Sequence, residues 1–590
     1  MQHLCRTMFL LLFLSSLPLM VSAQKHDYHW ITGYDGGEIS HDQPWFGLSV
    51  LKFSDFGKVD TINLQDPSID MKFFNTTISD ENGNLMFYTN GVGLNNYLHQ
   101  LMLNGDGMGG IPGTTGEEGG SSIPQGGIGV PWPGMPNQYF LLQEKSEYFP
   151  GDEEHPRKTT ALLYSRINMN VNNEEGEVIE KRIVFLQDTV ERGKSKLVRH
   201  ANGRDWWHIK NKLDENVFYR TLISPSGPEL RGQQTVGVTV MQGTGQAVFS
   251  PDGSKYAVLS TVSDLIGGVI AIYDFDRCSG LLSNQVYIPV DNDSASGGLA
   301  ISPNNRYLYQ SSSWYVYQYD LFAEDIESSR AIIATYDLNI DWFPTLFYAA
   351  QLAPDGRIYI ICPNSVPVMH RIEYPDEQGE ACMVKQHSVR LPTLNAFSIP
   401  NNPNYRLGPI DGSPCDTLGI DNLPKANFRA DQDTLSTYEF YFQDLSYYEP
   451  EEWFWTFGDG FNSESVSPTH SYGGDGVYEV CLTVSNANGS HTACDTLFLG
   501  IVDATEQIEP IAELQVFPNP FQTEFSLVMN DYYPKNAQLI IYDALGRKTH
   551  QQRIYQGWNT IDGVIWKSGI YFYELWDGGM KLGNGKVIKQ

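Results

Sequence analysis

Short apolar runs separated by polar turns dominate the chain. The clearest case is Ala247–Ser260, where an apolar run, a Pro-Asp-Gly turn and a second run with Tyr256, Val258 and Leu259 follow one another. Proline suits the first central position of a tight turn, and Asp-Gly tolerates the positive φ angles that such turns require. This stretch therefore predicts a β-hairpin.

The hairpin recurs at Leu299–Ser312 and at Gln351–Pro363. Its prolines, at positions 251, 303 and 354, are 52 and 51 residues apart. A fixed period of this size, with one hairpin in each unit, is typical of a β-propeller. Residues 240–375 also resemble the strand–SPDG–strand pattern of WD-type, YVTN-type and TolB-type propellers.

Weaker strand–turn–strand units precede these three hairpins. They lie at Trp45–Ile62, Phe73–Asn90, Asn137–Glu144 with Thr160–Ile167, and Val198–Leu222. The glycine-rich stretch Gly105–Gly129 predicts a long loop, and it lacks the spacing of a phosphate-binding loop. Dividing residues 24–411 by the repeat step predicts about seven blades, with six and eight left open. We expect N- and C-terminal strands to share one blade, because this removes exposed sheet edges.

Composition and charge narrow the class of protein. The 590 residues include 55 glycines and 32 prolines, and 41% are hydrophobic, which predicts an all-β chain of about three domains. With 39 basic and 70 acidic residues the net charge is −31. Such a surface repels phosphates and anionic membranes, so nucleic acid is excluded as a main partner.

The N-terminus predicts the compartment. Arg6 is followed by the short apolar run Met8–Met20 and by the small residues Val21-Ser22-Ala23, which indicates a signal peptide at 1–23, cleaved near Ala23. This run is too short for a stable anchor, and no later run reaches transmembrane length. His26 and His29 form an H-x-x-H pair just after the cleavage site, which we interpret as solvated residues near a chain end.

Six cysteines follow the signal peptide, an even number suited to an oxidising compartment. They show no CxxC spacing, which argues against a zinc site. Cys481 and Cys494 lie on two strand-like runs joined by a short turn, where we predict a cross-strand disulfide. The pairing of the other four is left open; they are Cys278, Cys362, Cys382 and Cys415.

The pattern changes after a hinge at residues 413–423. WTFGDG at Trp455–Gly460, P-x-H-x-Y at Pro468–Tyr472 and G-x-Y-x-V at Gly476–Val480 follow in order. These residues closely resemble a PKD domain, an immunoglobulin-like sandwich, which we place at 424–502; its motif residues are Trp455, Gly458, Asp459 and Gly460. We interpret Asp459 as a turn residue that bonds its own backbone, with a calcium ligand as the alternative. The sequence predicts no cofactor and identifies no metal site, and calcium binding is left open.

An acidic linker at residues 503–512 leads to a last segment, 513–590. It carries VFPNP, LIIYDALGRK, GIYFYEL and GKVIK in that order. The segment resembles the type A C-terminal sorting domain of the Bacteroidetes type IX secretion system. The motif residues are Pro518, Asn519, Pro520, Gly546, Gly569, Tyr571 and Lys586. The resemblance implies the type IX machinery as a partner, passage through the periplasm, and release or attachment at the outer-membrane surface.

Known catalytic signatures are missing from the sequence. Neither G-x-S-x-G nor H-E-x-x-H occurs. One cluster combines histidines, a carboxylate and two indoles: His200, Asp205, Trp206, Trp207 and His208. It could form a ligand site in which the indoles stack on a sugar ring. The interpretation we favour is that the tryptophans pack between blades and the histidines are satisfied locally.

Two functions remain for the propeller, residues 24–412. The favoured one is a secreted or surface-attached binding or adhesion protein, with a glycan or protein ligand and the PKD domain as a spacer. The alternative is a secreted enzyme that degrades polysaccharide or peptide on the propeller face. A pair of carboxylates in the central channel would favour the enzyme, and a filled channel would favour the binding platform.

Overall fold

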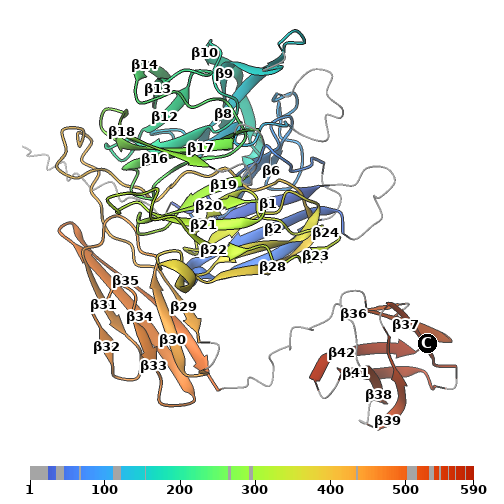
Figure 1. The fold of residues 1–590 in the computed structure, drawn as a ribbon. Helices are drawn as coiled ribbons and strands as arrows, with labels where there is room; N and C mark the ends of the chain where they lie inside the picture. Colours follow the sequence, from blue (N-terminus) through green and yellow to red (C-terminus); the bar gives the residue numbers. More distant parts are fainter. Residues whose placement is uncertain are drawn as a thin grey trace, which may run out of the picture. The chain divides into compact units, whose positions relative to one another are not determined.

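The computed structural model describes most of the chain in two compact units, Met1–Leu499 and Gly500–Gln590. The described residues are 24–34, 45–64, 68–109, 121–152, 155–263, 267–290, 297–433, 436–500, 514–517, 519–529, 537–543, 547–555, 557–564, 566–577 and 580–589. The predicted signal peptide and the linker at 503–512 lie outside them. Strands dominate both units (Figure 1).

Seven antiparallel sheets follow one another along the first part of the chain, each in sequence order. They are β1–β3 (His29–Tyr34, Gly47–Phe53, Val59–Leu64), β4–β6 (Thr76–Ser79, Leu85–Thr89, Leu94–Asn96), β7–β10 (Gly127–Pro131, Gln138–Tyr148, Arg157–Asn168, Glu177–Leu186), β11–β14 (Lys196–Arg199, Trp206–Asn211, Val217–Ser224, Gly227–Thr235), β15–β18 (Ala247–Phe249, Lys255–Ser263, Gly267–Asp276, Leu281–Val290), β19–β22 (Gly297–Ile301, Tyr307–Ser312, Tyr315–Asp320, Ala331–Thr335) and β25–β28 (Ala350–Leu352, Ile358–Ile360, Val366–Ile372, Val384–Asn395). Residues 127–129 of the predicted glycine-rich loop belong to β7.

The sheets form a closed ring because each shares a hydrophobic core with the next. Between the last and the first sheet, Trp30 and Phe53 pack with Tyr359, and the rings of Trp30 and Tyr359 are 5.5 Å apart. Strands β1 and β2 accordingly lie beside β28 (Figure 1). The expected β-propeller is confirmed, with seven sheets as its blades.

The three proline-marked hairpins are the first two strands of three blades. In the first of them, Ala247 pairs with Val258 across the turn, and Gly253 adopts a φ of 72°. The Asp252 carboxylate accepts a hydrogen bond from the backbone N–H of Ser254, 2.9 Å away. Turn chemistry therefore determines the hairpins, as the sequence predicted.

Ring closure differs from the expectation. The sheet β1–β3 contains N-terminal strands alone, and the chain after β28 adds no strand to it. Instead, the Asn75 side chain donates hydrogen bonds to Ile31 O (2.7 Å) and Ser398 Oγ (2.8 Å), and Asn401 N donates to Asn75 O (3.0 Å). Pro400 and Pro403 lack the N–H groups that a further ladder strand would need.

The second domain of the first unit is a two-sheet sandwich. Its sheets are β29–β30–β33 (Phe428–Gln432, Glu439–Asp444, Thr469–Ser471) and β32–β31–β34–β35 (Asn462–Ser463, Glu452–Thr456, Gly476–Asn486, Gly489–Leu499). Trp455, Val480 and Leu482 are fully buried between them. The immunoglobulin-like fold expected from the WTFGDG motif is confirmed.

This sandwich packs on the propeller through a buried arginine. The Arg429 guanidinium donates hydrogen bonds to the backbone carbonyls of Asp355 and Glu373, which belong to the last blade. On the first blade, Phe56 N donates to Asn427 Oδ1 (3.0 Å), and Lys58 forms an ion pair with Asp495. The sandwich is thereby attached to two adjacent blades.

The second unit is a smaller sandwich with its own core. Its sheets are β36–β37–β40 (Leu514–Phe517, Glu524–Met529, Gly557–Asp562) and β39–β38–β41–β42 (Lys548–Arg553, Ala537–Asp543, Gly569–Asp577, Met580–Lys589). Asn519 Nδ2 donates to the carbonyl of Lys586 (3.0 Å), which joins two of the motif segments. Gly569 and Tyr571 lie on β41, and Pro520 precedes β37; Pro518 and Gly546 lie outside the described residues.

Candidate functional site

The structure places the predicted cluster at 200–208 in the interior. Trp206 and Trp207 are neighbours on β12 and therefore point to opposite faces of the sheet, where they are 0% and 3% exposed. The Arg199 guanidinium lies 3.8 Å from the ring centre of Trp206, and the indole N–H of Trp207 donates to Arg277 O (2.9 Å). Neither indole offers a face on which a sugar could stack.

The polar members of the cluster bind the protein itself. His200 Nδ1 accepts a hydrogen bond from Asn202 N (2.9 Å), and Asp205 accepts hydrogen bonds from the side chains of Asn202 and Arg204. His208 is fully buried, and its two ring nitrogens have no hydrogen-bond partner among the described residues. Burial lowers the pKa of His208 to about 3, so this ring stays neutral. Trp206 and Trp207 belong to hydrophobic cores shared by neighbouring blades, and His200 and Asp205 bind residues of their own turn.

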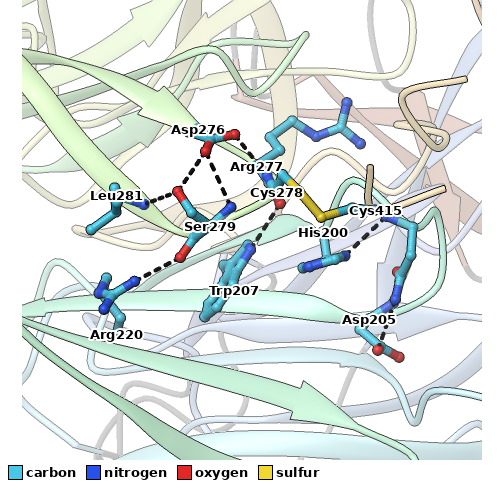
Figure 2. The surroundings of a disulfide bond; sticks show 11 residues. His200, Asp205, Trp207, Arg220, Asp276, Arg277, Cys278, Ser279, Leu281 and Cys415 are labelled. Atoms are coloured by element: carbon cyan, nitrogen blue, oxygen red, sulfur yellow. Dashed lines mark hydrogen bonds between the residues drawn. A yellow bond between two sulfur atoms is a disulfide. The ribbon is translucent and has the colours of Figure 1, made fainter. Parts of the chain in front are cut away.

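A disulfide lies beside this cluster, as Figure 2 shows. Cys278, in the turn between β17 and β18, is bonded to Cys415, 137 residues further along the chain. Cys481 and Cys494 are also bonded, across the ladder of β34 and β35, at the positions where the sequence predicted a bridge. Cys362 and Cys382 are buried free thiols. The first bridge attaches the segment after the propeller to the fifth blade.

The central channel is occupied by the chain itself. After β28, residues 397–406 run along the innermost strands. Asn401 Nδ2 donates to the carbonyls of Gly127 (2.8 Å) and Ser195 (2.9 Å), and the Tyr405 hydroxyl donates to Gly129 O (2.7 Å). At its far end, Arg406 binds the Asp27 carboxylate through two hydrogen bonds. We call residues 397–406 the channel segment.

A cavity of about 120 Å³ remains beside the channel segment. Lys196 lines it, and its ammonium donates to Asn402 O (3.0 Å). Burial lowers the pKa of Lys196 to about 7. Among the described residues around this cavity, Asp27 supplies the one carboxylate, and Arg406 holds it. The cavity thus lacks the paired carboxylates that glycoside hydrolysis usually requires.

The interpretation of His26 and His29 as solvated is wrong. Both are buried, and both bind Ser79: His26 Nδ1 donates to its carbonyl (2.7 Å), and His29 Nδ1 lies 3.0 Å from its hydroxyl. The chain enters the ring just before β1, so the residues after the predicted cleavage site are packed between the first two blades. Burial lowers the pKa of each histidine to about 4.

This burial predicts acid sensitivity. In the unfolded chain these histidines bind protons below a pKa of about 6.5, whereas in the folded state they stay neutral down to about 4. The contribution of the two neutral histidines to the free energy of unfolding is therefore fully present above pH 6.5. It decreases towards pH 4 by about 1.4 kcal/mol per pH unit for each histidine. We expect the urea midpoint to fall over this range, and to fall less in His26→Gln. Parallel curves for the two proteins would contradict the assignment.

The two faces of the propeller differ. The PKD sandwich contacts the face of the propeller that carries the turn between β25 and β26. The connection from β22 to β25 and the turn between β20 and β21 lie on the opposite face. That opposite face carries a short hairpin, β23 (Ile340–Asp341) and β24 (Phe343–Pro344). Large apolar side chains are exposed there: Trp314 46%, Leu338 71%, Ile340 68%, Trp342 55% and Phe343 51%.

Trp45 extends this surface from the first blade. Its ring centre lies 5.2 Å from that of Trp342, and its carbonyl accepts a hydrogen bond from Leu394 N, at the end of β28. We call Trp45, Trp314, Leu338, Ile340, Trp342 and Phe343 the aromatic surface. Sequence reasoning missed it because its tryptophans are far apart in the chain. The available signal was the apolar LNIDWF run inside a connection between blades.

Comparison with known families identifies two domains. Residues 422–500 match the PKD domain family, and residues 515–590 match the secretion system C-terminal sorting domain family. The chain thus carries both domains that its motifs resembled. The sorting domain marks it as a protein secreted to or beyond the cell surface and implies contact with the secretion machinery. The search of curated proteins returned no match.

Solved structures resemble separate parts of the chain. A putative 6-phosphogluconolactonase from Bacteroides uniformis ATCC 8492 is 11% identical, with a TM-score of 0.39, over 63% of this chain and 98% of its own. A protein from Lactobacillus plantarum is 10% identical, with a TM-score of 0.32, over 64% and 97%. The PKD1 domain of the Vibrio cholerae metalloprotease PrtV is 31% identical, with a TM-score of 0.12, over 13% and 95%.

The residues that the structure describes lack two kinds of feature. No helix in this part of the chain has the length and apolarity needed to cross a membrane. In the same residues, no group of three or more histidines, cysteines or carboxylates is arranged to hold a metal ion.

The carboxylate of Asp459 accepts hydrogen bonds from Phe461 N (3.1 Å) and His470 Nε2 (2.7 Å).

Proposed function

We propose that this chain is a secreted or surface-attached binding protein that meets an extracellular glycan or protein on its aromatic surface. The observation that carries the proposal is the exposure of Trp342 and its neighbours on the face opposite to the PKD domain. Contiguous exposed apolar side chains are uncommon on soluble proteins and commonly mark binding sites. In this proposal the PKD domain is a spacer that holds the aromatic surface away from the cell.

The channel segment and the small cavity beside it support binding over the enzymatic alternative. Propeller enzymes need an accessible cleft with catalytic groups, whereas here the channel segment occupies the centre of the ring. The buried carboxylate of Asp27 forms an ion pair with Arg406, and Lys196 lines the small cavity beside the channel segment. The exposed aromatic surface instead offers a broad apolar area for contact.

Substitution of Trp342 by alanine tests the proposal. We expect at least a tenfold loss of affinity for glycans or surface proteins that the wild type binds, because an exposed indole supplies a large contact area at low entropic cost. Binding is measured on a glycan array and by calorimetry with each ligand found. Phe322→Ala is the matched control, since Phe322 is 64% exposed on the same propeller but lies outside the aromatic surface.

Two results would contradict the proposal. Equal binding by the Trp342→Ala and Phe322→Ala proteins would exclude the aromatic surface as the site. Release of new reducing ends from a bound glycan would favour the enzyme instead.

A further inference from the structure

A cleft lies between the last blade and the PKD domain, away from the aromatic surface. It has a volume of about 590 Å³ and is lined by β27, β28 and the 3-10 turn Gly379–Cys382 on one side and by β29 and β30 on the other. Pockets of about 300–1,000 Å³ at domain interfaces commonly hold organic ligands. The cleft is therefore large enough for a short oligosaccharide.

Ion pairs that cross the domain boundary form its floor. Arg357 of the last blade binds Glu373 (2.8 Å) on the same blade and Asp431 (2.5 Å) on the PKD domain. Asp431 also accepts a hydrogen bond from Arg429 (2.7 Å), and all of these side chains are buried or half-buried. Because breaking a buried pair is costly, this network holds the two walls of the cleft at a constant separation.

The remaining cations around the cleft are also paired. Arg371 binds Glu373 at 2.7 Å, and Lys385 lies 3.8 Å from the same carboxylate. Lys385 is 43% exposed, but four carboxylates line the same cleft and would repel a phosphate or a carboxylate; they are Glu373, Glu377, Asp431 and Asp433. Such a lining favours an uncharged ligand that both donates and accepts hydrogen bonds.

Aromatic rings form the walls above this floor. Tyr374 of the propeller and Tyr441 of the PKD domain lie with ring centres 6.1 Å apart, and their planes are inclined by 59°. Tyr441 is 38% exposed, and the amide side chains of Gln432 and Gln443 line the same cleft. Tyrosine combines an apolar face with a polar hydroxyl, which suits a ligand with apolar C–H faces and hydroxyl edges.

We infer that this cleft binds an uncharged oligosaccharide, with Tyr374 and Tyr441 against the sugar faces and the flanking amides and hydroxyls on its edges. The inference goes beyond the proposed function because it concerns a second surface, built from both domains. It also gives the PKD domain a role in recognition in addition to that of a spacer.

The test uses the full chain and a panel of neutral hexasaccharides: cellohexaose, mannohexaose, xylohexaose and laminarihexaose. We expect at least one to bind in calorimetry, and Tyr441→Ala to raise its Kd at least tenfold with an unchanged melting temperature. Tyr438→Ala is the matched control, because Tyr438 is 37% exposed next to the same strand but does not line the cleft. Trp342→Ala should leave this binding unchanged.

Any of the following results would overturn the inference. One is the absence of binding by every neutral hexasaccharide, and another is equal binding by the Tyr441→Ala and Tyr438→Ala proteins. Binding that depends on Trp342 and is indifferent to Tyr441 would leave the proposed function intact and reject the cleft.

Discussion

A chain that ends at Asp503 is expected to accumulate in the periplasm and to be absent from the cell surface and the medium. It lacks the sorting domain but retains the entire first compact unit. The sorting domain has its own core, with Phe525, Leu539 and Leu575 fully buried, and this core contains no residue of the propeller or the PKD domain. Immunoblots of periplasmic, surface and medium fractions measure the effect.

The periplasmic product must be folded for this result to report on sorting. We expect the truncated protein to show the same thermal transition for the first unit and the same resistance to limited proteolysis as the full chain. If the folded, truncated protein reached the medium in normal amounts, the role of the C-terminal domain in secretion would be refuted.

Replacement of Tyr405 by alanine is expected to cost about 3–5 kcal/mol of propeller stability. Tyr405 is fully buried in the channel segment, where its ring lies 6.0 Å from that of Trp206 and 5.2 Å from that of His26. The alanine variant loses this packing and leaves a cavity at the centre of the ring. Urea unfolding of the full chain, followed by tryptophan fluorescence, measures the propeller transition.

Tyr405→Phe is the matched control. It keeps the ring and removes the hydroxyl that donates to Gly129 O, so we expect a loss of about 1 kcal/mol. If the alanine and phenylalanine variants unfolded at the same urea concentration, the channel segment would contribute little to ring closure.

The candidate ligand cluster shows where sequence reasoning stops. The sequence left two interpretations of Trp206-Trp207 open and favoured packing between blades over a sugar-binding site, but it could not decide how exposed the indoles are. In a propeller each blade is covered on both faces by its neighbours, and both indoles are buried. His26 and His29 were misjudged, because closeness to a chain end says nothing about which elements pack over it.

The channel segment and the aromatic surface illustrate the same limit. Asn401 and Tyr405 bind carbonyls more than 200 residues away, and Trp45 contacts Trp342 across the closure of the ring. Loop-closing contacts of this kind carry no local spacing pattern. They exist because the ring brings its first and last blades together.

By itself, the sequence determined the features that depend on local chemistry. The Pro-Asp-Gly turns and alternating strands predicted the repeated hairpins, and the WTFGDG and C-terminal motifs predicted two sandwiches and export. Tertiary structure alone decided what fills the channel, how Cys278 finds Cys415, which tryptophans meet solvent and where the propeller–PKD cleft opens. The physical reason is that turns and strand alternation are set by neighbouring residues, whereas burial and exposure are set by whichever distant segments the closed ring brings into contact.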